Sequence, residues 1–179
     1  DKDNSMWVGG LMGVSFWDGK TWHSFSRDFF PITETLSIDV SPDGTVWFGT
    51  EDGLVRFDGT NWKSFVREDG LPNTWIYGLA AASNNDIWIR TSGGLTYFDG
   101  LNMNTIDYQE LPILSGAISM LDDCTFLVPE GVVKVFNNKP SLFTWKNYNF
   151  PSTPNVNSIN LAPDNSVWLA TFEGALRLS

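Results

Sequence analysis

The amino-acid sequence predicts an all-β chain that is built from repeated units of four strands. Aromatic residues make up 15% of the 179 residues, with nine Trp and 13 Phe, and such side chains favour strands because their rings pack well on a pleated, half-buried surface. Turn-forming Gly, Pro, Asn and Asp recur at intervals of about 8–12 residues, which is typical of short strands joined by tight turns. No stretch keeps the helical period of about 3.6 residues over three turns.

Three sequence markers repeat in phase about every 40 residues. The first is a large aromatic residue near the start of a short apolar run: Trp7, Trp47, Trp88, Phe126 and Trp168. The second is a glycine just before the next apolar run: Gly13, Gly53, Gly94, Gly131 and Gly174. The third is a turn pair after that run: Asp18-Gly19, Asp58-Gly59 and Asp99-Gly100, replaced by Asn137-Asn138 in the fourth copy. Three markers in phase define a repeat.

The second unit shows the pattern of elements best. Its four expected strands, in order, are Leu36 to Val40, Thr45 to Thr50, Leu54 to Phe57 and Asn61 to Phe65. Tight turns join them, and the Asp-Gly pairs supply the positive φ that such hairpins need. A four-stranded antiparallel unit of about 40 residues has the size of a β-propeller blade. The sequence therefore predicts a β-propeller of about four to five blades.

The whole chain, 1–179, is expected to be a single propeller domain or propeller segment. Its complete units are 26–65, 66–106 and 107–145, flanked by two partial units, 1–25 and 146–179. The first partial unit holds only the last three strands of a blade, and the second holds only the first three. Either five blades close into a ring with two of them three-stranded, or the chain is an arc of a larger ring. An arc leaves apolar blade faces open, for which association is expected.

The repeated Trp residues are expected to fill the gaps between blades. Trp47 stands between the apolar Val46 and Phe48, and its counterparts have similar neighbours, as suits a residue buried on both faces of a sheet. The alternative is a row of platforms on which ligands stack.

Composition excludes several classes of function. The formal charge of −10, from 11 Lys+Arg against 21 Asp+Glu, would repel a phosphate backbone, so we expect no nucleic-acid partner. No apolar run approaches the roughly 20 residues of a membrane-spanning helix, so we expect no membrane insertion. The only cysteine is Cys124 and the only histidine is His23, which leaves no disulfide or cysteine-built zinc site. No phosphate-binding loop or calcium loop is found, and we expect no metal or other cofactor.

Two stretches carry a resemblance to a known family. Gly70-Leu71-Pro72-Asn73, followed by Ile76 to Leu79 and Asp86 to Leu95, resembles the two-component regulator propeller repeat, and so does Asp43 to Phe57. The similarity covers nearly the whole chain but departs from the pattern in 107–145. It implies a β-propeller of the ligand-binding sensor region that lies outside the cytoplasmic membrane in bacterial hybrid histidine kinases and often recognises glycans. Those sensors usually carry more blades and a β-sandwich.

Candidate ligand-binding residues lie mainly on the loops between blades, near 26–35, 66–75, 107–115 and 146–155. Aromatic rings stack on the C–H faces of sugars, and amide or charged groups bind the hydroxyls. The rim candidates are Trp75, Asn73, Tyr77, Arg67, Phe30, Glu34, Tyr108 and Tyr148. Asp39 and Asn160 occupy equivalent positions on inner strands, where they would bind a polar ligand or ordered water in the channel. Trp75 is the strongest single candidate.

These observations favour a non-enzymatic, extracytoplasmic module that recognises a glycan or a small polar molecule. One alternative is a scaffold that joins other protein chains or further propeller blades. A second alternative is a propeller enzyme, either a lyase or a glycan-active enzyme. Streptogramin-lyase-like propellers have comparable repeats but use several histidines, whereas His23 is alone. Asp18-Gly19 differs from a sialidase Asp-box and indicates a hairpin, and His23 is expected to be exposed on an outer strand.

Overall fold

The computed structural model describes residues 5–26, 34–107, 119–122, 125–128, 131–136, 139–144, 156–162, 166–171 and 174–178. Side chains are described within 5–26, 34–107, 166, 168–171 and 174–177, and at 162. The described residues form five antiparallel sheets, three of four strands and two of three strands. The fold is the predicted all-β propeller architecture. Within the described part of the chain, no helix has the length and apolar character needed to cross a bilayer.

Each sheet is one blade, and its strands follow one another in chain order. Blade 1 holds β1 (Met6–Gly10), β2 (Gly13–Trp17) and β3 (Trp22–Ser26). Blade 2 holds β4 (Thr35–Val40), β5 (Val46–Thr50), β6 (Leu54–Phe57) and β7 (Trp62–Phe65). Blade 3 holds β8 (Ile76–Ala81), β9 (Ile87–Thr91), β10 (Gly94–Phe98) and β11 (Met103–Ile106), after a short 3-10 turn, η1 (Arg67–Asp69). Blade 4 holds β12 (Ser119–Asp122), β13 (Thr125–Val128), β14 (Gly131–Phe136) and β15 (Lys139–Thr144). Blade 5 holds β16 (Val156–Leu161), β17 (Val167–Thr171) and β18 (Gly174–Leu178).

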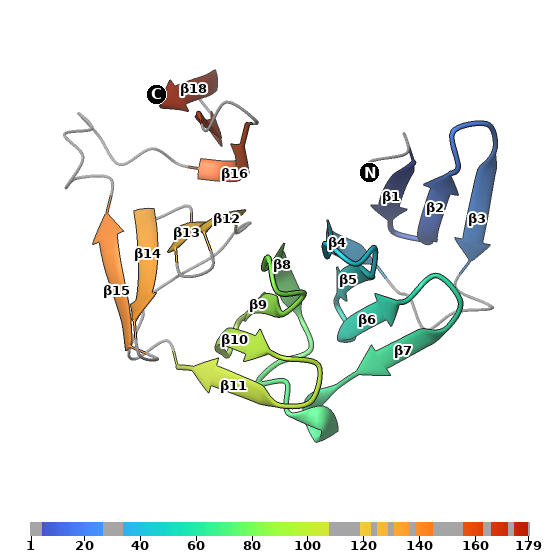
Figure 1. The fold of residues 1–179 in the computed structure, drawn as a ribbon, viewed down its shortest axis with the longest axis horizontal. Helices are drawn as coiled ribbons and strands as arrows, with labels where there is room; N and C mark the ends of the chain where they lie inside the picture. The colour runs from blue at the N-terminus through green and yellow to red at the C-terminus, as the bar shows by residue number, and fades with distance from the viewer. Residues whose placement is uncertain are drawn as a thin grey trace.

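The five blades follow one another around an open arc, with blade 1 and blade 5 at its two ends (Figure 1). The inner strands β4, β8, β12 and β16 line the inside of this arc. Among the described residues blade 1 has no strand inside β1, which carries Trp7 and occupies the place that β5 has in blade 2. Blade 5 has no fourth strand among the described residues.

The repeated Trp residues fill the space between blades where a following blade is described. Trp47 is 4% exposed and packs in one core with Phe65 of its own blade and Phe98 of blade 3. Its ring meets that of Phe98 edge-on at 5.9 Å. Trp168, at the end of the arc, is 44% exposed. The prediction that these rings wedge blades together is thus confirmed for Trp47, and Trp168 differs because no blade beyond blade 5 is described.

In blades 1 to 3 the repeated glycine makes room for the last strand of its sheet. Gly53 has φ 137°, and a Cβ there would lie 2.4 Å from the carbonyl oxygen of Phe65 on β7. At Gly174 the same φ region is used, but no atom lies within 4 Å of such a Cβ. This difference follows from the strand order, because no strand beyond β18 is described in blade 5.

The three Asp-Gly pairs form the hairpins that the sequence predicts. In each pair the Asp Oδ1 accepts the backbone N–H groups two and three residues later, as shown for Asp58 by distances of 3.0 and 2.7 Å to Thr60 and Asn61. Gly59 follows with φ 92°. These bonds stabilise the carboxylate and hold the pKa of Asp58 below its usual value.

Candidate functional site

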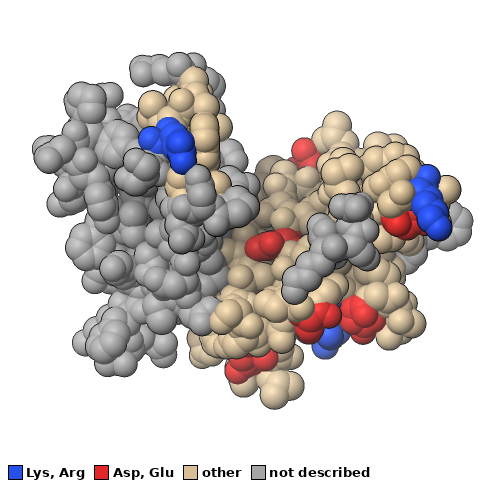
Figure 2. All heavy atoms as spheres, turned by 45° about the horizontal axis from the view of Figure 1, so that its top comes forward, with Lys and Arg blue, Asp and Glu red and all other residues tan. Residues whose placement is uncertain are grey.

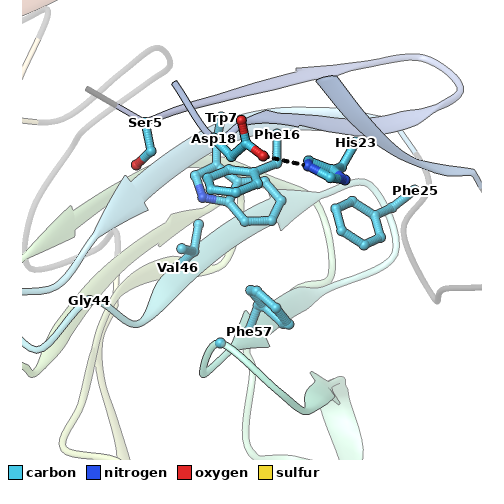
Figure 3. A pocket seen from close by; sticks show the side chains of 10 residues that line it. Ser5, Trp7, Phe16, Asp18, His23, Phe25, Gly44, Val46 and Phe57 are labelled. Carbon is cyan, nitrogen blue, oxygen red and sulfur yellow. Dashed lines mark hydrogen bonds and ion pairs between the residues drawn. The ribbon is translucent and has the colours of Figure 1, made fainter. Parts of the chain in front are cut away.

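A cavity of about 460 Å³ lies between blade 1 and blade 2 (Figure 3). It opens at the end of the sheets that carries the β2–β3, β4–β5 and β6–β7 turns. The loop 66–75 lies at the opposite end of β7, so this groove and the predicted loop rim are on different faces of the propeller. The lining residues are Ser5, Trp7, Phe16, Asp18, His23, Phe25, Gly44, Val46, Phe57 and Gly59. We call this cavity the blade 1–2 groove.

Aromatic rings form the walls of the blade 1–2 groove. Trp7 and Phe16 stand directly opposite each other on β1 and β2, and their ring centroids are 4.7 Å apart. Phe25 of β3 stacks on Trp7 at 5.8 Å, and Phe57 of blade 2 meets Trp7 edge-on at 5.6 Å. The alternation of side chains along a strand turns Trp7, Phe16 and Phe25 toward blade 2. The groove therefore presents a continuous aromatic surface from two adjacent blades.

A carboxylate and an imidazole stand at the edge of the aromatic surface. His23 lies opposite Phe16 on β3, and its Nε2 donates to Asp18 Oδ2 over 2.8 Å, the bond drawn in Figure 3. The two side chains are 51% and 35% exposed. Asp18 also accepts the backbone N–H groups of Lys20 and Thr21 at 2.8 and 2.7 Å.

These donors fix the charge of the Asp18 side chain. The hydrogen bond from His23, followed by those from the backbone of Thr21 and Lys20, holds the pKa of Asp18 far below its usual range. The carboxylate is therefore ionised at neutral pH. It can accept hydrogen bonds from hydroxyl groups of a ligand, and it is a weak proton acceptor in catalysis because its pKa is so low.

A second groove occupies the equivalent place between blades 2 and 3, and it is smaller and more polar. Its volume is about 220 Å³. The Arg56 guanidinium lies 5.9 Å from the Trp47 ring centroid, and the Lys63 ammonium lies 4.7 Å from that of Phe65. Both cations thus cover aromatic rings that would otherwise face the groove.

The repeat shows why the two grooves differ. Phe16 occupies the position of Arg56, and His23 occupies that of Lys63, because β1–β3 and β5–β7 align in phase. Phe16 thus places an apolar ring where blade 2 has the cationic Arg56, and the His23 side chain is shorter than that of Lys63. The blade 1–2 groove consequently keeps an accessible aromatic surface that the next groove lacks.

The structure brings three of the predicted rim residues together at the start of β8. Trp75 is 42% exposed, and its ring lies 6.3 Å from that of Tyr77. Asn73 Oδ1 accepts the backbone N–H of Trp75 at 3.0 Å, so this oxygen orders the loop. Trp75 is exposed as a ligand platform requires, and its role in binding stays a prediction.

The other rim candidates lie elsewhere or outside the described residues. Arg67 begins η1 and is exposed. Glu34 is half-buried just before β4, and its carbonyl oxygen accepts the N–H of Glu51 at 3.4 Å. Three predicted residues fall outside the described part of the chain: Phe30, Tyr108 and Tyr148. Asn160 lies in β16, where the backbone is described but the side chain is not.

Asp39 links two inner strands. Its Oδ2 accepts the N–H of Ala81 on β8 at 2.8 Å, and its Oδ1 accepts that of Val40 at 2.8 Å. Ser37 Oγ makes the parallel contact to the N–H of Leu79 at 3.0 Å. Burial raises the pKa of Asp39, although both backbone bonds oppose the shift. The structure gives this carboxylate a role in joining blades, and its predicted contact with a channel ligand or water stays a prediction.

Sequence reasoning did not identify the blade 1–2 groove as a site. Asp18-Gly19 was expected to form a hairpin and His23 to be exposed on an outer strand, and both expectations are confirmed. The signal for the site was present in the aligned repeats: Phe16 and His23 depart from the basic residues of the next blade. Such a departure acquires meaning only when the positions are known to face one cavity.

Comparison with known proteins supports the fold. No family model and no curated protein sequence matches the chain. The chain is similar to the extracellular domain of BT3049, a hybrid two-component system protein of B. thetaiotaomicron, with a TM-score of 0.73 and 15% identity over 100% of this chain and 27% of that one. It is also similar to virginiamycin B lyase from Staphylococcus aureus, with a TM-score of 0.73 and 13% identity over 100% of this chain and 67% of that one.

A further similar structure is PorZ, a surface component of the type IX secretion system of Porphyromonas gingivalis, with a TM-score of 0.67, 19% identity and coverage of 99% of this chain and 31% of that one. The chain thus spans about a quarter of the length of the BT3049 extracellular domain and two thirds of that of the lyase. These similarities show the β-propeller fold, which alone does not fix a function.

Proposed function

We propose that the chain is a non-enzymatic propeller segment of sensor type that binds a glycan or another small polar molecule outside the cytoplasm. The observation that carries the proposal is the blade 1–2 groove, in which an open aromatic surface borders a hydrogen-bonding pair of side chains. The similarity to extracellular domains of hybrid two-component system proteins supports the sensor type and the location.

The chemistry of the groove favours a ligand with one apolar and one hydroxylated face. The rings of Trp7 and Phe16, tilted by 33° to each other, offer apolar surface for the C–H face of a sugar ring. Asp18 accepts hydrogen bonds from hydroxyl groups beside that surface, and His23 orients the carboxylate. The volume of the groove, about 460 Å³, falls in the range of small-molecule sites, roughly 300–1,000 Å³.

Charge favours an uncharged ligand. Asp18 is ionised and the chain has a formal charge of −10. In the view of Figure 2, acidic side chains are scattered over the described part of the surface, and basic ones do not gather into a patch. A neutral oligosaccharide is therefore preferred over a uronic acid or a sulfated sugar.

The low pKa of Asp18 is the reason for proposing recognition over catalysis. A general acid or base works best with a pKa near the working pH, whereas the donors from His23 and the turn keep this carboxyl group ionised. The pair is thus suited to holding a ligand.

The test is a glycan array followed by calorimetric titration of the ligands that it identifies. In the first variant, Phe16→Arg and His23→Lys are combined, which gives blade 1 the residues of blade 2. We expect the affinity of this variant for the ligand from the array to fall by about tenfold or more, equivalent to about 1.4 kcal/mol. In the matched control, Arg56→Phe and Lys63→His make the opposite exchange in the second groove and leave the affinity unchanged.

Trp75→Ala separates the two faces of the propeller. Retained binding in this variant, with loss in the blade 1 variant, supports the groove. Loss in Trp75→Ala alone would move the site to the loop rim, and absence of any ligand from the array would overturn the proposal.

A further inference from the structure

Charged side chains of both signs line the cavity of about 220 Å³ between blades 2 and 3, which we call the blade 2–3 groove. Its positive charges are Arg56 of β6 and Lys63 of β7. Its carboxylates are Asp43 in the β4–β5 turn, Asp86 in the β8–β9 turn and Asp99 in the β10–β11 turn. Two cations and three anions therefore face one small space.

The two signs come from different parts of the blades. The strands of blade 2 follow one another from the inner β4 to the outer β7. Arg56 and Lys63 stand on the two outer strands, whereas Asp43 lies in the turn that leaves the inner strand. The N–H of Asp43 donates to Asn85 Oδ1 at 2.9 Å, which joins this turn to the turn of Asp86 in blade 3. The carboxylates of Asp43 and Asp86 thus belong to the inner end of the groove, and the cations belong to its outer part.

Each cation is held on its own blade by an aromatic ring. The Arg56 guanidinium lies 5.9 Å from the centroid of Trp47, and the Lys63 ammonium lies 4.7 Å from that of Phe65. Within residues 34–107, no ion pair joins either cation to a carboxylate. Contact with a ring face leaves the N–H groups of both cations able to donate to a ligand.

The inner carboxylates are held in place and keep acceptor capacity. Asp86 Oδ2 accepts hydrogen bonds from the Tyr97 hydroxyl and from Asn84 Nδ2. Asp43 Oδ1 accepts the N–H of Thr45 at 2.9 Å. In both side chains the second oxygen receives no hydrogen bond from the described part of the chain, so it can accept one from an ammonium group.

The mixed charge of the groove favours a ligand that carries both signs. A simple anion would be attracted by the cations and repelled by the three carboxylates, and a simple cation would meet the reverse. A molecule with an ammonium group at one end and a carboxylate at the other complements both parts. The volume of 220 Å³ corresponds to about seven water molecules at roughly 30 Å³ each, which suits a ligand as small as an amino acid or a dipeptide.

We propose that the blade 2–3 groove binds a small zwitterion, a free amino acid or a dipeptide. Asp43 and Asp86 bind its ammonium group, and Arg56 and Lys63 bind its carboxylate. The ring contacts and turn bonds hold these groups before the ligand arrives, which lowers the cost of ordering them. This site is independent of the proposed glycan site, because the blade 1–2 groove has no cation at the positions of Arg56 and Lys63.

The experiment is calorimetric titration of the chain with alanine, with alanylalanine and with two blocked dipeptides. N-acetyl-alanylalanine lacks the ammonium group, and alanylalanine amide lacks the carboxylate. We expect at least one zwitterion to bind and each blocked dipeptide to bind about tenfold or more weakly than the better zwitterion, because each loses charged hydrogen bonds. Tighter binding of alanine identifies a free amino acid as the ligand, and tighter binding of alanylalanine identifies a dipeptide.

Two charge-removing variants place the ligand in the groove. Lys63→Gln and Asp43→Asn are each expected to lower the affinity for the better zwitterion by about tenfold. Their matched controls, Lys20→Gln and Asp52→Asn, remove the same charges from exposed side chains that line neither groove, and they keep the wild-type affinity. The proposal would be overturned if neither zwitterion bound at millimolar concentration, if the blocked dipeptides bound equally well, or if the groove variants behaved like their controls.

Discussion

Replacing equivalent Trp residues inside and at the end of the arc tests whether these rings hold the blades together. Trp47 is 4% exposed, packs on Phe65 and Phe98, and donates its Nε1–H to Ser41 Oγ at 2.9 Å. Trp168 has the same repeat position and is 44% exposed. The comparison varies burial while keeping the residue type and the strand position constant.

The expected magnitudes differ by several kcal/mol. Removing a buried Trp side chain costs about 3–5 kcal/mol, because transfer energy is lost and a cavity is left. A substitution on an open surface changes stability by about 0.5 kcal/mol, so Trp168→Ala is expected to have a small effect. Domains are stable by about 5–15 kcal/mol, and Trp47→Ala should therefore lower the urea midpoint strongly.

The assay is equilibrium unfolding in urea, followed by circular dichroism, at a protein concentration low enough for the chain to be monomeric. Unchanged slopes would show that the difference in midpoint reports stability. If Trp47→Ala cost no more than Trp168→Ala, the interpretation of the repeated Trp as an interblade wedge would be wrong.

Three further substitutions test the contacts of the repeated glycine, of the Trp47 indole and of Asp39. Gly53→Ala is expected to lower the thermal midpoint more than Gly174→Ala, because both have φ near 130° but only the first Cβ meets a carbonyl oxygen, at 2.4 Å; equal losses would contradict the role of the fourth strand. Ser41→Ala leaves the buried indole N–H of Trp47 without its acceptor and is expected to cost about 1–3 kcal/mol in urea unfolding, whereas a neutral result would show that the bond contributes nothing. Burial raises the pKa of Asp39 above 3.8, so the folded chain binds the proton of this carboxyl group more tightly than the unfolded chain does. The free energy of unfolding therefore increases as the pH falls from the raised pKa toward 3.8. Asp39→Asn removes that gain, so the wild type should improve relative to the variant over this acidic range; parallel pH profiles would refute the assignment.

Much of the fold could be predicted from the sequence because the repeat constrains it. The expected strand Leu36 to Val40 is observed as β4 (Thr35–Val40), and the expected Leu54 to Phe57 is β6. The markers for these strands are local: Asp-Gly pairs fix the turns, and apolar runs fix the strands between them. Gly53 marks the repeat in the sequence, and the structure shows that the lack of a side chain there makes room for β7.

The candidate site was harder to predict because a groove depends on how completely the side chains of two neighbouring blades fill the space between them. Phe16 and Arg56 occupy the same repeat position, yet one lines an open aromatic groove and the other covers a ring. Sequence spacing aligns these residues but does not show which end of a blade is hollow. Exposure of Trp75 was predictable from its loop position, whereas the contact of Asp39 with Ala81 depends on how closely two inner strands approach.

The most direct test of the binding site is a nuclear magnetic resonance titration of the labelled chain with the best ligand from the glycan array, in which the indole N–H signals are assigned by single Trp substitutions. The account predicts that the signal of Trp7 shifts with saturation while that of Trp75 stays in place. A shift of the Trp75 signal with an unchanged Trp7 signal would contradict it.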